Sequence, residues 1–178
     1  FVADSLDIAF ADTALDTAGL IAKQEPAREA LVSKCGENVN IRRLERVEGD
    51  VVGAYLHGNR IGVVVTMTGG DVELAKDVAM HVAASNPQFL DPTQVSDEAI
   101  AKEKEIFMAL NEDKIKGKPE NIVENMVKGR INKFLAEASL VEQAFIKNPE
   151  VTVGQLAKKA GATIVSFVRF EVGEGIDR

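Results

Sequence analysis

The chain has 178 residues, 46% of them hydrophobic, with 28 acidic and 21 basic side chains and a formal net charge of -7. This size and apolar content suit one compact unit or two small subdomains. The acidic balance argues against nonspecific binding to phosphate backbones, so we expect no direct nucleic-acid partner.

The single cysteine, Cys35, cannot form a disulfide within the chain, and no apolar run reaches the roughly 20 residues that a membrane span requires. These features favour a cytoplasmic protein with no membrane partner. Because the chain begins at Phe1 rather than at Met, we expect it to be part of a longer protein.

Two helices are predicted first. Apolar residues recur at helical spacing over residues 1–17, which predicts an amphipathic helix that ends at Gly19. Pro26 suits a first helical turn and Gly36 suits a helix end, so we expect a second helix over residues 26–36.

Strand patterns follow over residues 39–47, 51–56 and 60–67, and Gly58-Asn59 between the last two predicts a tight hairpin turn. We therefore expect an antiparallel sheet.

Next, an apolar stripe predicts a helix over residues 71–84. Ser96 is suited to cap a long helix that reaches about residue 114. A break at residues 116–119 precedes a second helix that runs to residue 138, so the two helices are expected to pair as an antiparallel hairpin.

After the hairpin we expect an extended segment over residues 140–146, a short helix from Thr152 to Lys159, and a last strand over residues 163–172. The predicted fold is α+β, with an antiparallel sheet, packed helices and a projecting antiparallel helical hairpin. The predicted division is a core over residues 1–95, the hairpin over 96–138, and completion of the core sheet over 139–178.

Several long motifs occur in an order that resembles bacterial elongation factor Ts. They are residues 36–43 (GENVNIRR), 48–51 (EGDV), 55–63 (YLHGNRIGV), 79–85 (AMHVAAS), 126–130 (MVKGR) and 170–175 (FEVGEG). The resemblance implies that these segments form the core domain. It also implies that the hairpin is the coiled-coil or dimerisation subdomain, compatible with a homodimer or a two-plus-two complex.

The same resemblance implies a function by contact rather than by chemistry. Members of the family bind the GTPase elongation factor Tu and act as guanine-nucleotide exchange factors that promote GDP release. We therefore expect no enzyme activity and no cofactor.

Members of this family begin with a small three-helix domain, followed by a Thr-Asp-Phe-Val-Ala motif whose Phe wedges near the magnesium site of the GTPase. Phe1-Val2-Ala3-Asp4 imitates that motif, but it lies too close to residues 36–38, and helical periodicity continues through it. We therefore expect the wedge, and the three-helix domain, to lie upstream of this chain. A last C-terminal helix of the family is expected beyond Arg178.

Five residues are the candidate contacts with elongation factor Tu implied by the resemblance: His57, Cys35, Gly36, Phe145 and Ile146. His57 flanks the hairpin turn, where an ordinary exposed histidine is the alternative. Cys35-Gly36 is expected to approach the phosphate-loop side of the partner, and a plain helix C-cap is the alternative.

Phe145 and Ile146 occupy an apolar segment that in the family contacts the third domain of elongation factor Tu, and a core strand is the alternative. The break at Asn148-Pro149 favours a surface edge. The basic tip of the hairpin, residues 114–118, is a further candidate contact with an acidic surface.

Three motifs could in principle support other chemistry, and each lacks residues that this chemistry needs. A Cys35–His57 nucleophile pair lacks an orienting partner and a flanking hydrolase motif. His81, one turn after Asp77, lacks the further ligands of a metal site and is predicted to be a packed helix histidine. Gly69-Gly70 resembles a phosphate-binding turn but lacks its Lys and Ser/Thr.

A different class of function stays open beside nucleotide exchange. The chain could be a scaffold or assembly module that self-associates through its helical hairpin. An enzyme is the third alternative.

Overall fold

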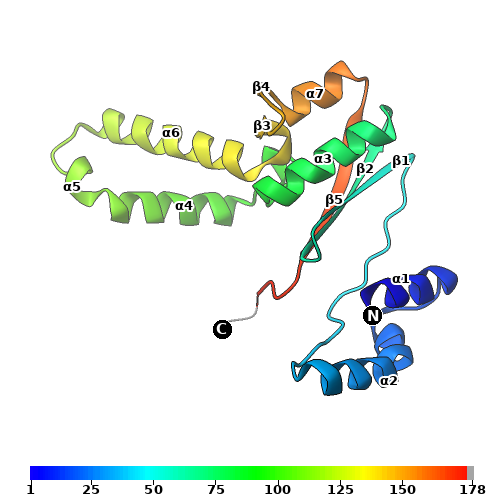
Figure 1. Cartoon of the computed structure of the whole chain (residues 1–178). Helices are drawn as coiled ribbons and strands as arrows, with labels where there is room; N and C mark the ends of the chain where they lie inside the picture. The colour runs from blue at the N-terminus through cyan, green and yellow to red at the C-terminus, as the bar shows by residue number, and fades with distance from the viewer. Residues whose placement is uncertain (176–178) are drawn as a thin grey trace. The chain divides into compact units, whose positions relative to one another are not determined.

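The computed structural model describes residues 1–175 and separates into two compact units, Phe1–Arg46 and Val47–Arg178 (Figure 1). Helices and an antiparallel sheet occur together, which confirms the predicted α+β class. The predicted division into residues 1–95, 96–138 and 139–178 stays a prediction.

Two helices make up most of the first unit, α1 (Val2–Ala11) and α2 (Thr17–Cys35). Ala9 of α1 and Leu20 of α2 are buried. A buried hydrogen bond also joins the two helices, because Nε2 of Gln24 donates to the Ser5 hydroxyl at 2.9 Å. The polar atoms of this contact therefore satisfy each other away from water.

The predicted end of the second helix at Gly36 is confirmed, but the predicted end of the first helix and start of the second are wrong. The first helix ends at Ala11 rather than near residue 17, and Asp16 caps the next helix by accepting from the Gly19 N–H at 2.7 Å. Gly19 and Pro26 consequently lie inside α2. An interior proline costs a helix about 3 kcal/mol. The cap at Asp16 and the buried side chains of α2, Leu20 and Gln24, offset part of this cost.

Residues 39–47 do not form the predicted strand, and no other strand pairs with them in the described part of the chain. Side chains hold this segment instead. Nη1 of Arg28 donates to the Val39 carbonyl at 3.2 Å. Arg46 Nη2 donates to carbonyls at the end of α1 and just after it, those of Ala9 at 2.7 Å, Asp12 at 2.8 Å and Leu15 at 3.2 Å. Such contacts satisfy carbonyls that a helix end leaves unpaired.

The second unit is built on a three-stranded antiparallel sheet in the order β1-β2-β5 (Figure 1). Its strands are β1 (Val51–His57), β2 (Ile61–Thr68) and β5 (Thr163–Glu171). The hairpin turn at Gly58-Asn59 and the return of the last strand from beyond the helical hairpin are both confirmed. The sheet therefore joins segments that lie a hundred residues apart.

Helix α3 (Val72–Ser85) packs on one face of this sheet. Its buried side chains Ala75, Val78, Ala79 and Val82 belong to the same core as Val63, Val65 and Met67 of β2. A Cβ on Gly53 of β1 would lie 2.4 Å from the Ala75 carbonyl carbon. Only glycine therefore lets the helix backbone approach the strand this closely.

The predicted helical hairpin is present and projects from the sheet in Figure 1, with α4 (Asp97–Leu110), the single-turn α5 (Glu112–Ile115) and α6 (Glu120–Ala138). The first helix ends earlier than the predicted residue 114. At its C-cap, the backbone N–H and the side-chain amide of Asn111 both donate to the Phe107 carbonyl, at 3.1 and 2.9 Å.

Short elements connect the hairpin to the sheet: η1 (Pro92–Gln94), η2 (Leu140–Glu142), β3 (Ala144–Phe145), β4 (Asn148–Thr152) and α7 (Val153–Lys159). Residues 140–146 were expected to be extended, and this is wrong for the 3-10 turn at their start. The predicted cap is confirmed, because Thr152 and Gln155 form a reciprocal capping box at the start of α7.

Candidate partner-binding site

His57 is the last residue of β1, and its side chain is exposed at the sheet rim. Tyr55 lies two residues earlier on the same face of the strand, with its hydroxyl 3.4 Å from His57 Nδ1 and the ring centroids 6.3 Å apart. The imidazole therefore has a neighbour that limits its orientation. Contact between His57 and a partner stays a prediction.

Cys35 ends α2 in the first unit, and Gly36 follows as its C-cap with a left-handed φ of 73°. The Gly36 N–H donates to the Val32 carbonyl at 2.8 Å, which is the capping geometry of the alternative interpretation. The Cys35 thiol is free and exposed.

Phe145 and Ile146, which were predicted together, differ in burial. The Phe145 side chain is 4% exposed and belongs to the core of the second unit. Phe145 is therefore a core residue, as in the alternative interpretation, and the surface edge predicted for it is wrong. Ile146 follows at the β3–β4 turn with 43% of its surface exposed, and its contact with a partner stays a prediction.

His81 of α3 is fully buried, as expected for a packed helix histidine. Its Nε2 lies 2.8 Å from Oε1 of Gln143, and its Nδ1 accepts from the Ile146 N–H at 3.2 Å. The ring centroid lies 6.0 Å from that of Phe145. Burial lowers the pKa of the His81 imidazole below its usual value of 6.5, so the ring is neutral at physiological pH.

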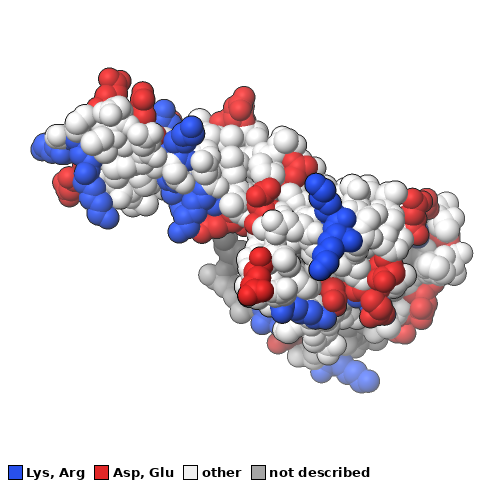
Figure 2. Space-filling model, turned by 90° about the horizontal axis from the view of Figure 1, so that it is seen from above, with Lys and Arg blue, Asp and Glu red and all other residues white. Residues whose placement is uncertain are grey.

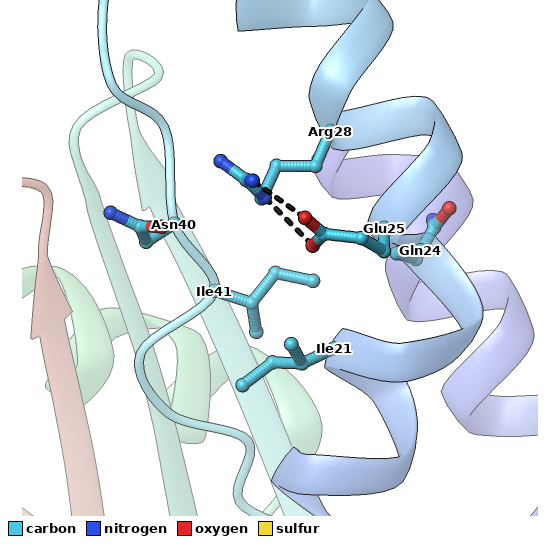
Figure 3. A pocket seen from close by; sticks show the side chains of 6 residues that line it. All are labelled: Ile21, Gln24, Glu25, Arg28, Asn40 and Ile41. Carbon is cyan, nitrogen blue, oxygen red and sulfur yellow. Dashed lines mark hydrogen bonds and ion pairs between the residues drawn. The ribbon is translucent and has the colours of Figure 1, made fainter.

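A small cavity of about 160 Å³ lies beside α2 within the first unit (Figure 3). Glu25 accepts from Arg28 at 2.6 and 2.8 Å, and Ile41 points toward α2 from the following segment. The hydrogen bond from Arg28 lowers the pKa of the Glu25 carboxyl. The two charges neutralise each other, and pockets for drug-sized ligands usually measure about 300–1,000 Å³. This cavity does not suit a nucleotide.

Gly69-Gly70, which was weighed as a phosphate-binding turn, closes against another loop. Gly69 has a φ of 74°, and a Cβ on it would lie 2.4 Å from the Gly161 carbonyl oxygen. The glycine serves the close packing of two backbones, which needs no ligand.

Charges of both signs lie along the helical hairpin, as Figure 2 shows from above. Its tip carries the lysines 114, 116 and 118 with acidic residues close in sequence. Within residues 1–175, no group of three or more His, Cys, Asp or Glu side chains could hold a metal ion. No helix in that range has the length and apolar character needed to cross a membrane.

Two side-chain contacts near the predicted site were not predicted from the sequence. The pairing of Tyr55 with His57 could have been found, because residues two apart share one face of a strand. The contact between Lys147 Nζ and Asp77 Oδ1 at 2.5 Å joins residues 70 positions apart, and no local pattern indicates it. No hydrogen bond or ring contact in the described chain joins His57 to Phe145 or Ile146.

Comparison with known proteins gives one consistent result. The model of the family described as Elongation factor TS matches residues 9–174. Proteins named Elongation factor Ts from Azotobacter vinelandii, Pseudomonas fluorescens and Stutzerimonas stutzeri are 78%, 76% and 75% identical over all 178 residues. The chain covers 62% of the length of each of these relatives.

Proposed function

The chain belongs to the elongation factor Ts family, and we propose that it acts in translation by binding elongation factor Tu and promoting the release of GDP. The observation that carries the proposal is the family match, which includes the motifs around His57 and His81. Because translation takes place in the cytoplasm, a cytoplasmic location is part of the same proposal.

The proposed activity needs contact and no covalent chemistry, so we assign the chain no enzyme activity and no cofactor. One observation supports this assignment. The charges of Glu25 and Arg28 are paired with each other in the cavity beside α2.

The mechanism follows from thermodynamic linkage. A protein that binds the nucleotide-free form of a GTPase more tightly than the GDP-bound form lowers the affinity for GDP by the same factor. Exchange is then a shift between two populations of elongation factor Tu, and the chain supplies only differential contact.

We assign the contact to exposed residues on well-packed elements. His57 is held at the end of a paired strand, and Ile146 is held at a turn whose neighbour Phe145 is anchored in the core. Such side chains lose little freedom when a partner binds. The helix end at Cys35-Gly36 is a further proposed contact.

Release of fluorescent GDP from elongation factor Tu in a stopped-flow instrument tests this proposal. We expect the release rate to rise with the concentration of the chain and then to saturate. His57→Ala should require more chain to reach the same rate, whereas Leu110→Ala on the hairpin is the control that should not. A release rate unchanged at any concentration of the chain would overturn the proposal.

The second candidate function is a scaffold that self-associates through the hairpin, as a homodimer or within a two-plus-two complex. Exposed apolar side chains on the hairpin favour it, namely Ile106, Leu110 (79% exposed) and Ile122. Sedimentation of the chain alone should then show a dimer that Leu110→Asp weakens. Stable binding to elongation factor Tu without faster GDP release would favour this function over exchange.

A further inference from the structure

Two side chains of α3, one helical turn apart, hold the turn between β3 and β4. Asp77 Oδ1 lies 2.5 Å from Lys147 Nζ, and His81 Nδ1 accepts from the backbone N–H of Ile146 at 3.2 Å. The first contact is between exposed side chains, so it contributes little. The second is made by a fully buried imidazole, so its loss would leave a polar group of the core unpaired.

The hydrogen bonds also fix the tautomer of His81. Because Nδ1 accepts from a backbone N–H, the ring proton lies on Nε2, which donates to Gln143 Oε1 at 2.8 Å. One imidazole thus bonds to residues on both sides of β3. Gln143 in turn donates to the Glu137 carbonyl of α6 at 2.7 Å. The Nε2 side of the ring faces the base of the helical hairpin, and the Nδ1 side faces the turn.

The neighbouring residues Phe145 and Ile146 consequently have different roles. Phe145 points into the core beside the His81 ring, and Ile146 presents its side chain at the surface. A backbone held on both sides of β3 keeps that exposed side chain in one place before any partner arrives.

We propose that His81 is a positioning residue that presents Ile146 to elongation factor Tu through its Nδ1 atom. The inference rests on the proposed function, because it names how one surface of that function is organised. His81 itself is buried and does not touch the partner.

Two amide variants separate the roles of the two ring nitrogens. Asn reaches about as far as Nδ1, so His81→Asn keeps an acceptor for the Ile146 N–H. Gln reaches about as far as Nε2, so His81→Gln keeps a partner for Gln143 but loses the acceptor for the Ile146 N–H. We expect His81→Gln to bind elongation factor Tu about tenfold more weakly, and His81→Asn to remain within about threefold of the unmodified chain.

A double-mutant cycle with Ile146→Ala shows whether His81 acts through Ile146. The pair His81→Gln with Ile146→Ala should bind no more weakly than Ile146→Ala alone. Asp77→Asn, which releases the exposed contact to the same turn, is the matched control and should change affinity little. Penalties that add, or equal losses in His81→Asn and His81→Gln, would overturn the proposal.

Amide exchange of Ile146 in the chain alone keeps this inference distinct from the proposed function. The N–H should exchange about tenfold faster in His81→Gln than in His81→Asn. Equal exchange rates would overturn the positioning role even if the chain binds elongation factor Tu. A chain with the expected exchange rates that does not bind elongation factor Tu would overturn the proposed function and the partner assigned to Ile146.

Discussion

Within the second unit, the sheet core and the helical hairpin bury their apolar side chains to different extents. Val65 and Met67 of β2 and Val78 of α3 are wholly buried. Helix α4 of the hairpin has no buried residue, and Leu110 at its end is 79% exposed. Apolar side chains are thus fully buried in the sheet core and partly exposed in the helical hairpin.

The difference follows from the number of layers that cover each element. The central strand β2 has a strand on each side and α3 across one face, whereas each helix of the hairpin packs mainly on the other. Stability should therefore be concentrated in the sheet core, and the hairpin should open locally at lower cost. A second copy of the chain would therefore have more to gain by covering the hairpin than by covering the core.

The largest expected effect compares one substitution in the two regions. Leu140→Ala removes a fully buried side chain from the core and should lower the free energy of unfolding by about 2–5 kcal/mol. Leu110→Ala should change it by less than about 0.5 kcal/mol. Urea denaturation followed by circular dichroism measures both. Similar losses would show that the hairpin is as tightly packed as the core.

The next effect depends on pH and belongs to the core side of the comparison. The pKa of His81 is lowered by burial in the folded chain, so the unfolded chain binds the proton more readily. Stability is fully present above pH 6.5 and falls below it, by at most about 1.4 kcal/mol per pH unit. Carboxyl groups titrate lower, below about pH 5.

Denaturation at pH 7.5 and pH 5.5 checks this prediction, with His81→Asn as the control. The variant lacks the titrating group and should lose less stability over that interval. An equal loss in both proteins would assign the pH dependence to other groups.

A smaller effect is expected within the hairpin. Nη2 of Arg130 on α6 lies 2.6 Å from Glu103 on α4, and the Glu103 side chain is 14% exposed. Glu103→Gln should cost about 1 kcal/mol, between the values for exposed and buried pairs. Hydrogen exchange should speed up in α4 and α6 and not in β2. Lys133→Gln, at an exposed pair with Glu137, is the matched control.

The smallest effect on stability is expected at the sheet rim. His57→Ala should change the free energy of unfolding by less than about 0.5 kcal/mol, because its side chain is exposed. Its affinity for elongation factor Tu should nevertheless fall. Calorimetric titration measures the affinity and thermal melting the stability. A lower melting temperature with unchanged affinity would make His57 a structural residue.

The sequence predicts elements that depend on local signals better than elements that depend on distant partners. Elements with a local signal were found close to their observed bounds, including the Gly58-Asn59 turn, the Thr152 cap and the two long helices of the hairpin. Residues 39–47 carry strand-like alternation, but among residues 1–175 no strand pairs with them, and no local pattern reveals this.

For the candidate site, the sequence indicated positions but not burial. Phe145 and Ile146 are adjacent and apolar, and only the packing of β3 against His81 separates the anchored residue from the exposed one. Asp16 is a residue type suited to a helix N-cap, and it accepts from the Gly19 N–H. The apolar periodicity through residue 17 nevertheless favoured one continuous helix at that position. The pairing of His81 with Ile146 spans 65 positions, and such contacts form only when the chain folds.

We propose that this chain works by binding one state of elongation factor Tu better than another. Its affinity should be measured by calorimetry for elongation factor Tu without nucleotide and for the same protein saturated with GDP and magnesium. We expect clearly tighter binding to the nucleotide-free form, with the ratio of the two affinities equal to the loss of GDP affinity in the complex. Equal affinities for the two forms would contradict it, however tightly the chain binds.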